Sequence, residues 1–232
     1  MLETLKKQVC DANLKLVDQG LVVQTFGNVS GIDRDQGLVV IKPSGVSYDK
    51  MHPRQMVVVS LADGGLVEGE LRPSSDTPTH LELYRAFDAI GGVVHTHSAF
   101  ATAWAQAHSE IEAIGTTHAD YFYGPVPCTR PMRTEEIDHH YEANTGKVIV
   151  EHFTERDLDP AEFPGALVDS HGPFTWGDTP DGAVDCAVIL EYIARLAAET
   201  IKINPYPRRI SDELMNRHFL RKHGAGKYYG QE

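Results

Sequence analysis

Short β-type runs set between amphipathic helices constrain the fold of this chain most. The runs at 38–42 and 56–61 are rich in valine, and the second leads through the turn Ala-Asp-Gly-Gly into another run at 66–69. Two β-type runs that meet across a short glycine-containing turn are typical of a β-hairpin. This mixture of hairpins and helices favours a layered α/β sandwich over a doubly wound parallel sheet.

Helical periodicity accounts for much of the remaining chain. Apolar residues recur at helical spacing from Leu2 to Leu16, and Gly20 supplies a stop. Further helices are predicted at 77–88, 98–107, 134–144, 181–201 and 211–223, and further strands at 91–97, 147–153 and 166–171. No repeat, low-complexity segment or linker interrupts residues 1–232, so a single domain is expected.

The charge balance and the cysteines argue against several classes of protein. A formal net charge of -12 opposes binding to nucleic acid, which depends on a basic face. A small phosphorylated metabolite remains compatible, because a few local N–H groups and one cation can hold a phosphate. No apolar run approaches the roughly 18–20 residues of a membrane span. Three scattered cysteines and an acidic, amphipathic opening favour a cytoplasmic protein.

The most specific local feature is a pair of histidines at the end of an apolar run. His95 and His97 are two residues apart, so on a strand both imidazoles point to the same face. His171 also ends an apolar run and is followed by a turn. Neutral imidazoles suit zinc and other first-row metals, and three protein ligands leave a position open for substrate. The alternative is that these are core histidines with local hydrogen bonds, but three in similar settings favour a divalent metal.

Three short segments have the composition of phosphate-binding loops, namely 27–30 (Gly-Asn-Val-Ser), 42–45 (Lys-Pro-Ser-Gly) and 74–76 (Ser-Ser-Asp). Small residues let backbone N–H groups approach an anion, and Lys42 could supply a local cation. Each segment alone is more typical of a turn, and together they predict a phosphate pocket. Asp76 could either cap the helix that follows or turn towards the metal.

Longer motifs extend over essentially the whole chain. They are TFGNVSGIDR, VIKPSGVSY, RPSSDTPTH, GGVVHTHS, GTTHADYFYG, DSHGPFTWG and LRKHGAGKYYGQ. In this order they make the chain similar to the class II aldolase/epimerase family. The resemblance implies an α/β/α sandwich around a central, mainly antiparallel sheet. It also implies a cyclic homotetramer whose active sites lie between subunits.

The resemblance assigns roles to particular residues. It implies one divalent metal per subunit, most often zinc, with manganese and cobalt also compatible. The implied metal ligands are His95, His97, His171 and Asp76. The implied phosphate-binding residues are Gly27, Asn28, Ser44, Gly45, Ser74 and Ser75, and Lys42 is the local cation predicted beside them. The implied acid/base pair is Asp120 and Tyr229, the tyrosine reaching a neighbouring subunit's site, with His218 and Lys227 as candidates to lower its pKa.

Position 76 bears on the reaction. The aldolases of the family carry a glutamate in this loop, whereas this chain has the shorter Asp76, as the epimerases do. The resemblance therefore implies epimerisation of L-ribulose 5-phosphate at C4, giving D-xylulose 5-phosphate. The implied route is retro-aldol cleavage and re-addition through an enediolate that the metal stabilises. The alternatives are a sugar-phosphate aldolase, a dehydratase of the same fold and a non-catalytic scaffold.

Overall fold

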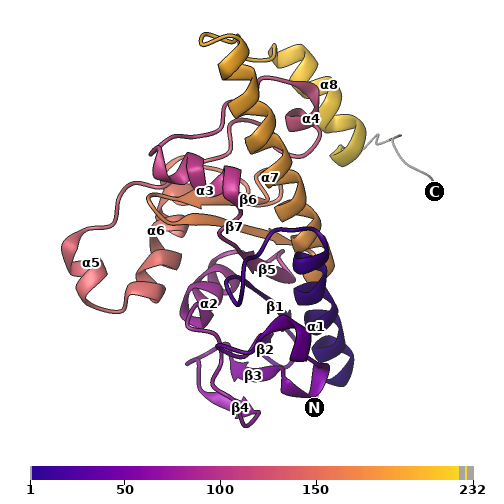
Figure 1. Cartoon of the computed structure of the whole chain (residues 1–232), viewed down its shortest axis with the longest axis vertical. Helices are drawn as coiled ribbons and strands as arrows, with labels where there is room; N and C mark the ends of the chain where they lie inside the picture. The colour runs from indigo at the N-terminus through magenta and orange to yellow at the C-terminus, as the bar shows by residue number, and fades with distance from the viewer. Residues whose placement is uncertain (1, 225–227, 229–232) are drawn as a thin grey trace.

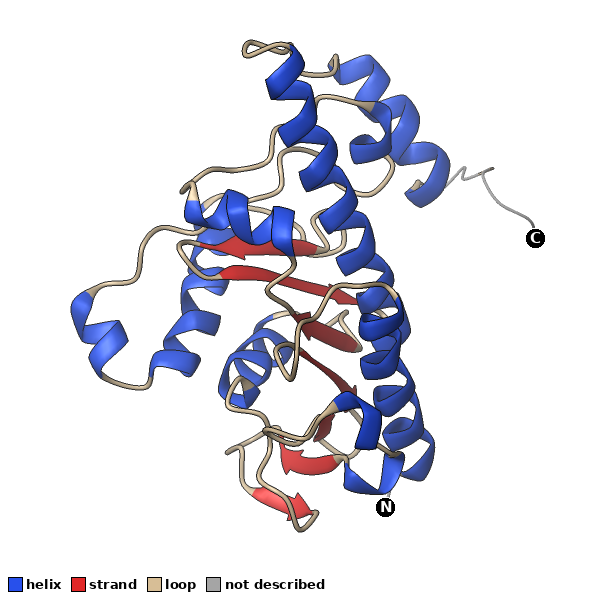
Figure 2. Cartoon of the chain, in the orientation of Figure 1, coloured by secondary structure: helices blue, strands red, loops and turns tan. Residues whose placement is uncertain are grey.

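The computed structural model describes residues 2–224 and 228, and a seven-stranded sheet lies at its centre (Figures 1 and 2). The strands are β1 (Asn28–Asp33), β2 (Leu38–Ile41), β3 (Val57–Ser60), β4 (Leu66–Glu68), β5 (Gly92–His95), β6 (Gly165–Val168) and β7 (Gly172–Gly177). Their order is β4-β3-β2-β1-β5-β7-β6, and every neighbouring pair is antiparallel. The predicted β3–β4 hairpin and the antiparallel sheet are confirmed.

Helices cover both faces of this sheet. They are α1 (Glu3–Asp18), α2 (Thr77–Ala86), α3 (Ala99–Gln106), α4 (Thr116–Ala119), α5 (Thr134–Asp138), α6 (Tyr141–Glu155), α7 (Pro180–Ile203) and α8 (Asp212–His223). Helices α1 and α7 pack on one face and α2 and α6 on the other (Figure 1). The predicted layered α/β/α sandwich is therefore confirmed. Across residues 2–224 and 228, no helix combines the length and the apolar character that a membrane span requires.

Alternation along the strands explains why both faces are covered. Val29 and Val94 are paired across β1 and β5 and pack against α1 and α7. Their neighbours Ser30 and Val93 are also paired and face the other way, where the Ser30 hydroxyl hydrogen-bonds the side chains of α2. Because successive side chains point to opposite faces, a strand with helices on both sides is buried along its whole length.

Four predictions from the sequence require correction. The segment 147–153 belongs to helix α6 and is no strand, because the buried Val148, Ile149 and Phe153 lie on one face of a helix that packs on α2. Gly146 permits this packing, since a Cβ there would lie 2.9 Å from the carbonyl oxygen of Thr79. The helix predicted at 134–144 divides into α5 and the start of α6, with His140 at φ 56° in the break. Strand β1 begins within the predicted loop 27–30, and strand β7 begins directly after His171, where the sequence predicts a turn.

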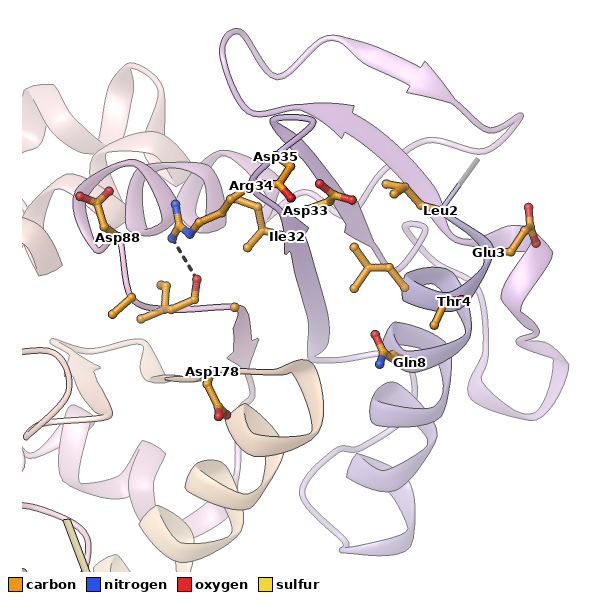
Figure 3. A pocket seen from close by; sticks show the side chains of 14 residues that line it. Leu2, Glu3, Thr4, Gln8, Ile32, Asp33, Arg34, Asp35, Asp88 and Asp178 are labelled. Carbon is orange, nitrogen blue, oxygen red and sulfur yellow. Dashed lines mark hydrogen bonds between the residues drawn. The ribbon is translucent and has the colours of Figure 1, made fainter.

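A cleft of about 680 Å³ opens where β1 ends and β5 begins (Figure 3). His95 lies at the other end of β5. Its lining includes Asp33, Asp35, Asp88 and Asp178, and none of the predicted site residues. The guanidinium of Arg34 in this lining donates to the carbonyl oxygens of α2 and of the turn after it. So many carboxylates would repel a phosphate, and the candidate site lies elsewhere.

Candidate metal centre and anion site

Three histidines converge where β5 ends. His95 is the last residue of β5, His97 follows it, and His171 lies in the turn between β6 and β7. One ligand atom from each lies within 4.8 Å of the others, and the Nε2 atoms of His95 and His97 are 3.1 Å apart. The ring centroids of His171 lie 4.8 Å from His95 and 5.1 Å from His97. The structure thus brings together the three histidines that the sequence singled out.

The arrangement of these nitrogens fits a divalent ion. Ligands held at about 2.0–2.1 Å from a tetrahedral zinc are about 3.3 Å apart, close to the His95–His97 separation. The Nδ1–H of His95 donates to the carbonyl oxygen of Pro173 over 3.0 Å, which leaves the Nε2 lone pair directed at the other two rings. A backbone acceptor on the far nitrogen is the usual way in which proteins orient a metal-binding histidine.

The sheet register fixes the orientation of His95. Asn28 on β1, His95 on β5 and Phe174 on β7 are paired across the three strands, so their side chains form one row. The His95 ring stacks on Phe174, with centroids 4.1 Å apart and planes inclined by 13°. The imidazole is therefore held by packing on one side and by a hydrogen bond at its rear, before any ligand binds.

The histidines are adapted to binding as neutral ligands. Burial, followed by the neighbouring His171 and His97, holds the pKa of His95 well below its ordinary value. Burial likewise lowers the pKa of His171. At neutral pH both rings are unprotonated and have a free lone pair, which is the form that a metal requires.

Asp76 stands at the N-terminus of α2 and makes no capping hydrogen bond there within the described chain. Its Oδ2 instead accepts a 2.6 Å hydrogen bond from Nδ2 of Asn28, the neighbour of His95 in the row. The Asp76 charge raises the pKa of both Lys42 and His171, against the larger effect of burial. The carboxylate therefore lies near both the histidines and the lysine, although it is not in the three-histidine group.

Lys42 is the cation expected of an anion site. Its side chain follows β2, is only 2% exposed and lies over the ring of Tyr48 at 4.9 Å. Among the residues that the structure describes, the ammonium makes one long hydrogen bond, 3.5 Å to the carbonyl oxygen of Thr25. Burial lowers the pKa of Lys42, since a charged group loses hydration that this single bond does not replace. A bound anion would supply the missing partner.

The three predicted phosphate loops lie around this lysine. Segments 42–45 and 72–76 run side by side, since Pro43 pairs with Pro73 and the backbone N–H of Ser74 donates to the carbonyl oxygen of Lys42. Gly27, at φ 83°, fits against the backbone of β5, where a Cβ would lie 2.9 Å from the carbonyl oxygen of His95. Oδ1 of Asn28 is buried and lacks a hydrogen-bond partner among the residues described. This oxygen is available to accept a hydrogen bond from a hydroxyl group of a ligand.

Asp120 has a different environment, at the end of α4. Its carboxylate accepts hydrogen bonds from His218 and Arg221 of α8, at 2.9–3.2 Å, and Lys222 lies 3.6 Å away. Burial favours the neutral acid, but the bonds from His218 and Arg221 outweigh it and hold the pKa of Asp120 below its ordinary value. His218, which the sequence suggested as a helper of Tyr229, thus contacts Asp120.

Two predicted residues, Lys227 and Tyr229, lie outside the described residues. One neighbour of the centre was missed in the sequence, namely Tyr141 at the start of α6. Its hydroxyl lies 3.4 Å from Nδ1 of His171, on the side of the ring corresponding to the Pro173 contact of His95. A single tyrosine in a polar helix carries no sequence signal for such a role.

His118 makes the fold sensitive to acid. Its buried Nε2–H donates to the carbonyl oxygen of Gly124 over 2.7 Å, and burial lowers the pKa of His118 from 6.5 to about 4. Between these values the unfolded chain binds a proton that the folded chain does not. The stability from this neutral ring is present above pH 6.5 and is lost as the pH falls towards 4.

We expect the free energy of unfolding to fall between pH 7.5 and 5 by about 2 kcal/mol more in the wild type than in His118→Gln. Urea denaturation of the metal-free proteins at both pH values measures this difference. The variant His52→Gln, at an exposed position, should keep the wild-type pH dependence. An unchanged pH dependence in His118→Gln would contradict the assignment.

Known proteins resemble the chain in sequence and in fold. The model of the class II aldolase and adducin N-terminal domain matches residues 7–198. The L-ribulose-5-phosphate 4-epimerases UlaF of Salmonella paratyphi B and Salmonella typhi are each 56% identical to it over 231 residues, covering 100% of both chains. An L-fuculose 1-phosphate aldolase structure superposes with a TM-score of 0.78 at 25% identity, over 93% of this chain and 94% of that one. The L-fuculose 1-phosphate aldolase of Glaciozyma antarctica PI12, at 16% identity, has a TM-score of 0.76 over 94% and 80% and shows the shared fold.

Proposed function

The chain belongs to the class II aldolase and adducin family, and on this premise we propose that it is a metal-dependent epimerase that interconverts L-ribulose 5-phosphate and D-xylulose 5-phosphate. One observation carries the proposal. The three convergent histidines and the buried Lys42 both lie near Asp76, which is bonded to the strand partner of His95 and follows the loop that pairs with Lys42. Such a site suits a small molecule with metal-binding oxygens at one end and a phosphate at the other.

The proposed ligands of the metal are His95, His97 and His171, with Asp76 as the fourth. We propose zinc, while manganese or cobalt would suit the same donors. A bound ion would supply Lewis-acid stabilisation of the negative charge that develops on substrate oxygens. Asn28 holds Asp76 through its amide N–H, and its free carbonyl oxygen is placed to accept a substrate hydroxyl.

The phosphate is proposed to bind Lys42 and the loops around it. The other members of this pocket are Gly27, Asn28, Ser44, Gly45, Ser74 and Ser75. The Lys42 ammonium would exchange one long hydrogen bond for a charge-assisted one, and the small residues let backbone N–H groups approach the phosphate oxygens. With both ends of the substrate held, the C3–C4 bond between them has a fixed position.

Inversion at C4 cannot proceed by simple deprotonation and reprotonation of that carbon, because the hydrogen on C4 is not acidic, and the proposed route instead breaks the C3–C4 bond. The C4 hydroxyl loses its proton, the C3–C4 bond breaks, and its electron pair passes into the C2 carbonyl. The products are the enediolate of dihydroxyacetone and glycolaldehyde phosphate. The aldehyde then presents its other face, the bond forms again and the C4 oxygen regains a proton.

Asp120 and Tyr229 are the proposed acid/base pair for the C4 oxygen. With its pKa held below the ordinary value, Asp120 is a carboxylate at neutral pH and is ready to accept a proton. A tyrosine of ordinary pKa, near 10, is protonated at this pH and is ready to donate one. We propose that both residues contribute to an active site that lies at a subunit boundary.

We further propose that the protein is a cytoplasmic homotetramer. Large apolar side chains are exposed in the described monomer, among them Phe26 beside His97 and Tyr192 and Ile203 on α7. Contact with a neighbouring subunit would remove these side chains from water. A boundary beside His97 would bring a neighbouring subunit to the metal centre.

The experiment that tests this function is to incubate the metal-analysed protein with L-ribulose 5-phosphate and identify the products. We expect D-xylulose 5-phosphate to form, and its formation to stop when a chelator removes the metal and to resume when zinc is restored. Accumulation of dihydroxyacetone and glycolaldehyde phosphate would identify an aldolase instead. No turnover by a metal-loaded protein would overturn the assigned substrate.

A further inference from the structure

Helix α3 connects the two parts of the metal centre. It begins at Ala99, two residues after His97, and its last turn leads to His108, which contacts the turn that carries His171. The two metal-binding segments come from β5 and from the β6–β7 turn, which are separated by about 70 residues of sequence. Helix α3 therefore links His97 and His171 in space, although the two ligands are distant in the sequence.

The N-terminus of α3 is anchored by Glu191 of α7. The two carboxylate oxygens of Glu191 accept hydrogen bonds from the backbone N–H groups of Phe100 and Ala101, at 2.8 and 2.9 Å. First-turn N–H groups have no partner within a helix and carry a partial positive charge, so a carboxylate is well suited to hold them. The Ser98 side chain makes no such bond within the part of the chain described. Glu191 thus fixes where the segment after His97 begins.

The C-terminus of α3 is attached to the turn that carries His171. The carbonyl oxygen of Ala105 accepts a 3.0 Å hydrogen bond from the backbone N–H of Ser170. Nδ1 of His108 lies 2.7 Å from Oδ2 of Asp169, whose side chain is 5% exposed. Ser170 has a φ of 59°, in the left-handed region that costs a serine free energy. External contacts such as these are what hold a turn in that conformation.

The middle of α3 is also in close contact with both supports. The indole N–H of Trp104 donates to the carbonyl oxygen of Ala194 on α7 over 2.9 Å. On the other side, a Cβ at Gly172 would lie 3.4 Å from Oγ1 of Thr102 and 2.9 Å from the carbonyl oxygen of Thr96. Helix α3 is thus bonded to α7 at Trp104 and lies next to the start of β7 at Thr102, so both of its neighbours fix its position.

We propose that α3 sets the separation of His97 and His171, and that Glu191 and the Asp169–His108 pair are positioning residues for the metal centre. This inference rests on the proposed metal-dependent function and adds to it the elements that bring its ligands into register. None of the three residues supplies a ligand atom to the histidine group. They act through the backbone of the segments that carry His97 and His171.

The test measures cobalt binding by metal-depleted protein, without substrate. We expect Glu191→Ala and His108→Ala each to weaken Co²⁺ binding by about tenfold or more, and to change the visible absorption spectrum of the bound ion. Glu191→Gln, which keeps one acceptor oxygen, should lie between Glu191→Ala and the wild type. His108 has a side chain that is 62% exposed, so its replacement keeps the test possible should Glu191→Ala fail to fold.

A matched control separates positioning from general stability. Thr179 caps the N-terminus of α7 by accepting a 3.0 Å hydrogen bond from the N–H of Gly182, far from Glu191 and at the end of β5 opposite to His95. Thr179→Ala should lower the free energy of unfolding yet bind Co²⁺ with wild-type affinity and spectrum. Wild-type cobalt binding in Glu191→Ala and His108→Ala would overturn this inference alone. A wild-type protein that binds no cobalt would overturn the proposed metal function and this inference with it.

Discussion

Replacing His97 by asparagine is expected to abolish metal binding at neutral pH and to lower epimerase activity by at least about 10³-fold. The imidazole supplies one of three convergent nitrogens, and the shorter amide cannot place a donor at the same point. Loss of the ion removes several kcal/mol of charge stabilisation from the transition state, and each 1.36 kcal/mol corresponds to a factor of ten in rate.

The fold should tolerate this substitution well. His97 is exposed and follows the end of β5, so we expect the free energy of unfolding of the metal-free protein to change by no more than about 0.5 kcal/mol. Metal content measured on purified protein, together with a product assay, checks the prediction. His139→Asn, at an exposed histidine outside the centre, is the matched control and should retain both properties. A His97→Asn protein with full metal content and normal turnover would refute the ligand assignment.

Lys42→Met is expected to raise the KM for the sugar phosphate by roughly 100-fold, because a buried charge-assisted hydrogen bond to phosphate is lost. Burial lowers the pKa of Lys42, which means that the fold disfavours its charged form. Methionine of similar length avoids that cost, so the free energy of unfolding should stay the same or rise. The variant therefore tests phosphate binding separately from stability. If Lys42 mainly supported the fold, its replacement would weaken substrate binding and lower the free energy of unfolding together.

The measurement combines steady-state kinetics with the stabilisation that the sugar phosphate confers on the protein against heat. We expect the ligand to raise the melting temperature of the wild type and to have little effect on Lys42→Met at the same concentration. Lys7→Met, at an exposed lysine of α1 paired with Asp11, should behave as the wild type. A normal KM in Lys42→Met would show that the phosphate binds elsewhere.

Local sequence patterns predicted those helices and strands in which the spacing of apolar residues matches the face that is buried. The β3–β4 hairpin and the helix α7 follow directly from valine runs, turn residues and apolar spacing. The segment at 147–153 was wrongly predicted as a strand, because its valines and isoleucine suit a strand, and the packing of α6 on α2 outweighs that preference. Strand β1 was missed because glycine, asparagine and serine weaken the signal that its neighbours in the sheet impose.

The candidate site was predicted to the extent that its residues stand in recognisable local motifs. His95 and His97 share a strand end, and Lys42 follows an apolar run, so each carries a local signal. The contacts of Asp120 with α8 and of Glu191 with α3 join residues about 90 or more positions apart. Periodicity carries no information about such pairs, and they emerge only when the helices pack.

The row formed by Asn28, His95 and Phe174 has a consequence for how this site can change during evolution or by design. Three separate strands each contribute one member, and their hydrogen-bonded register decides that the three side chains point the same way. Deleting one residue from β1 would turn the opposite set of its side chains to that face, which would replace Asn28 and remove Ser30 from its hydrogen bonds with α2. The centre therefore cannot be transplanted into another protein as a loop. Insertions should be tolerated in peripheral turns such as the one joining β3 to β4, whereas changes of length within β1, β5 or β7 would disable the chemistry.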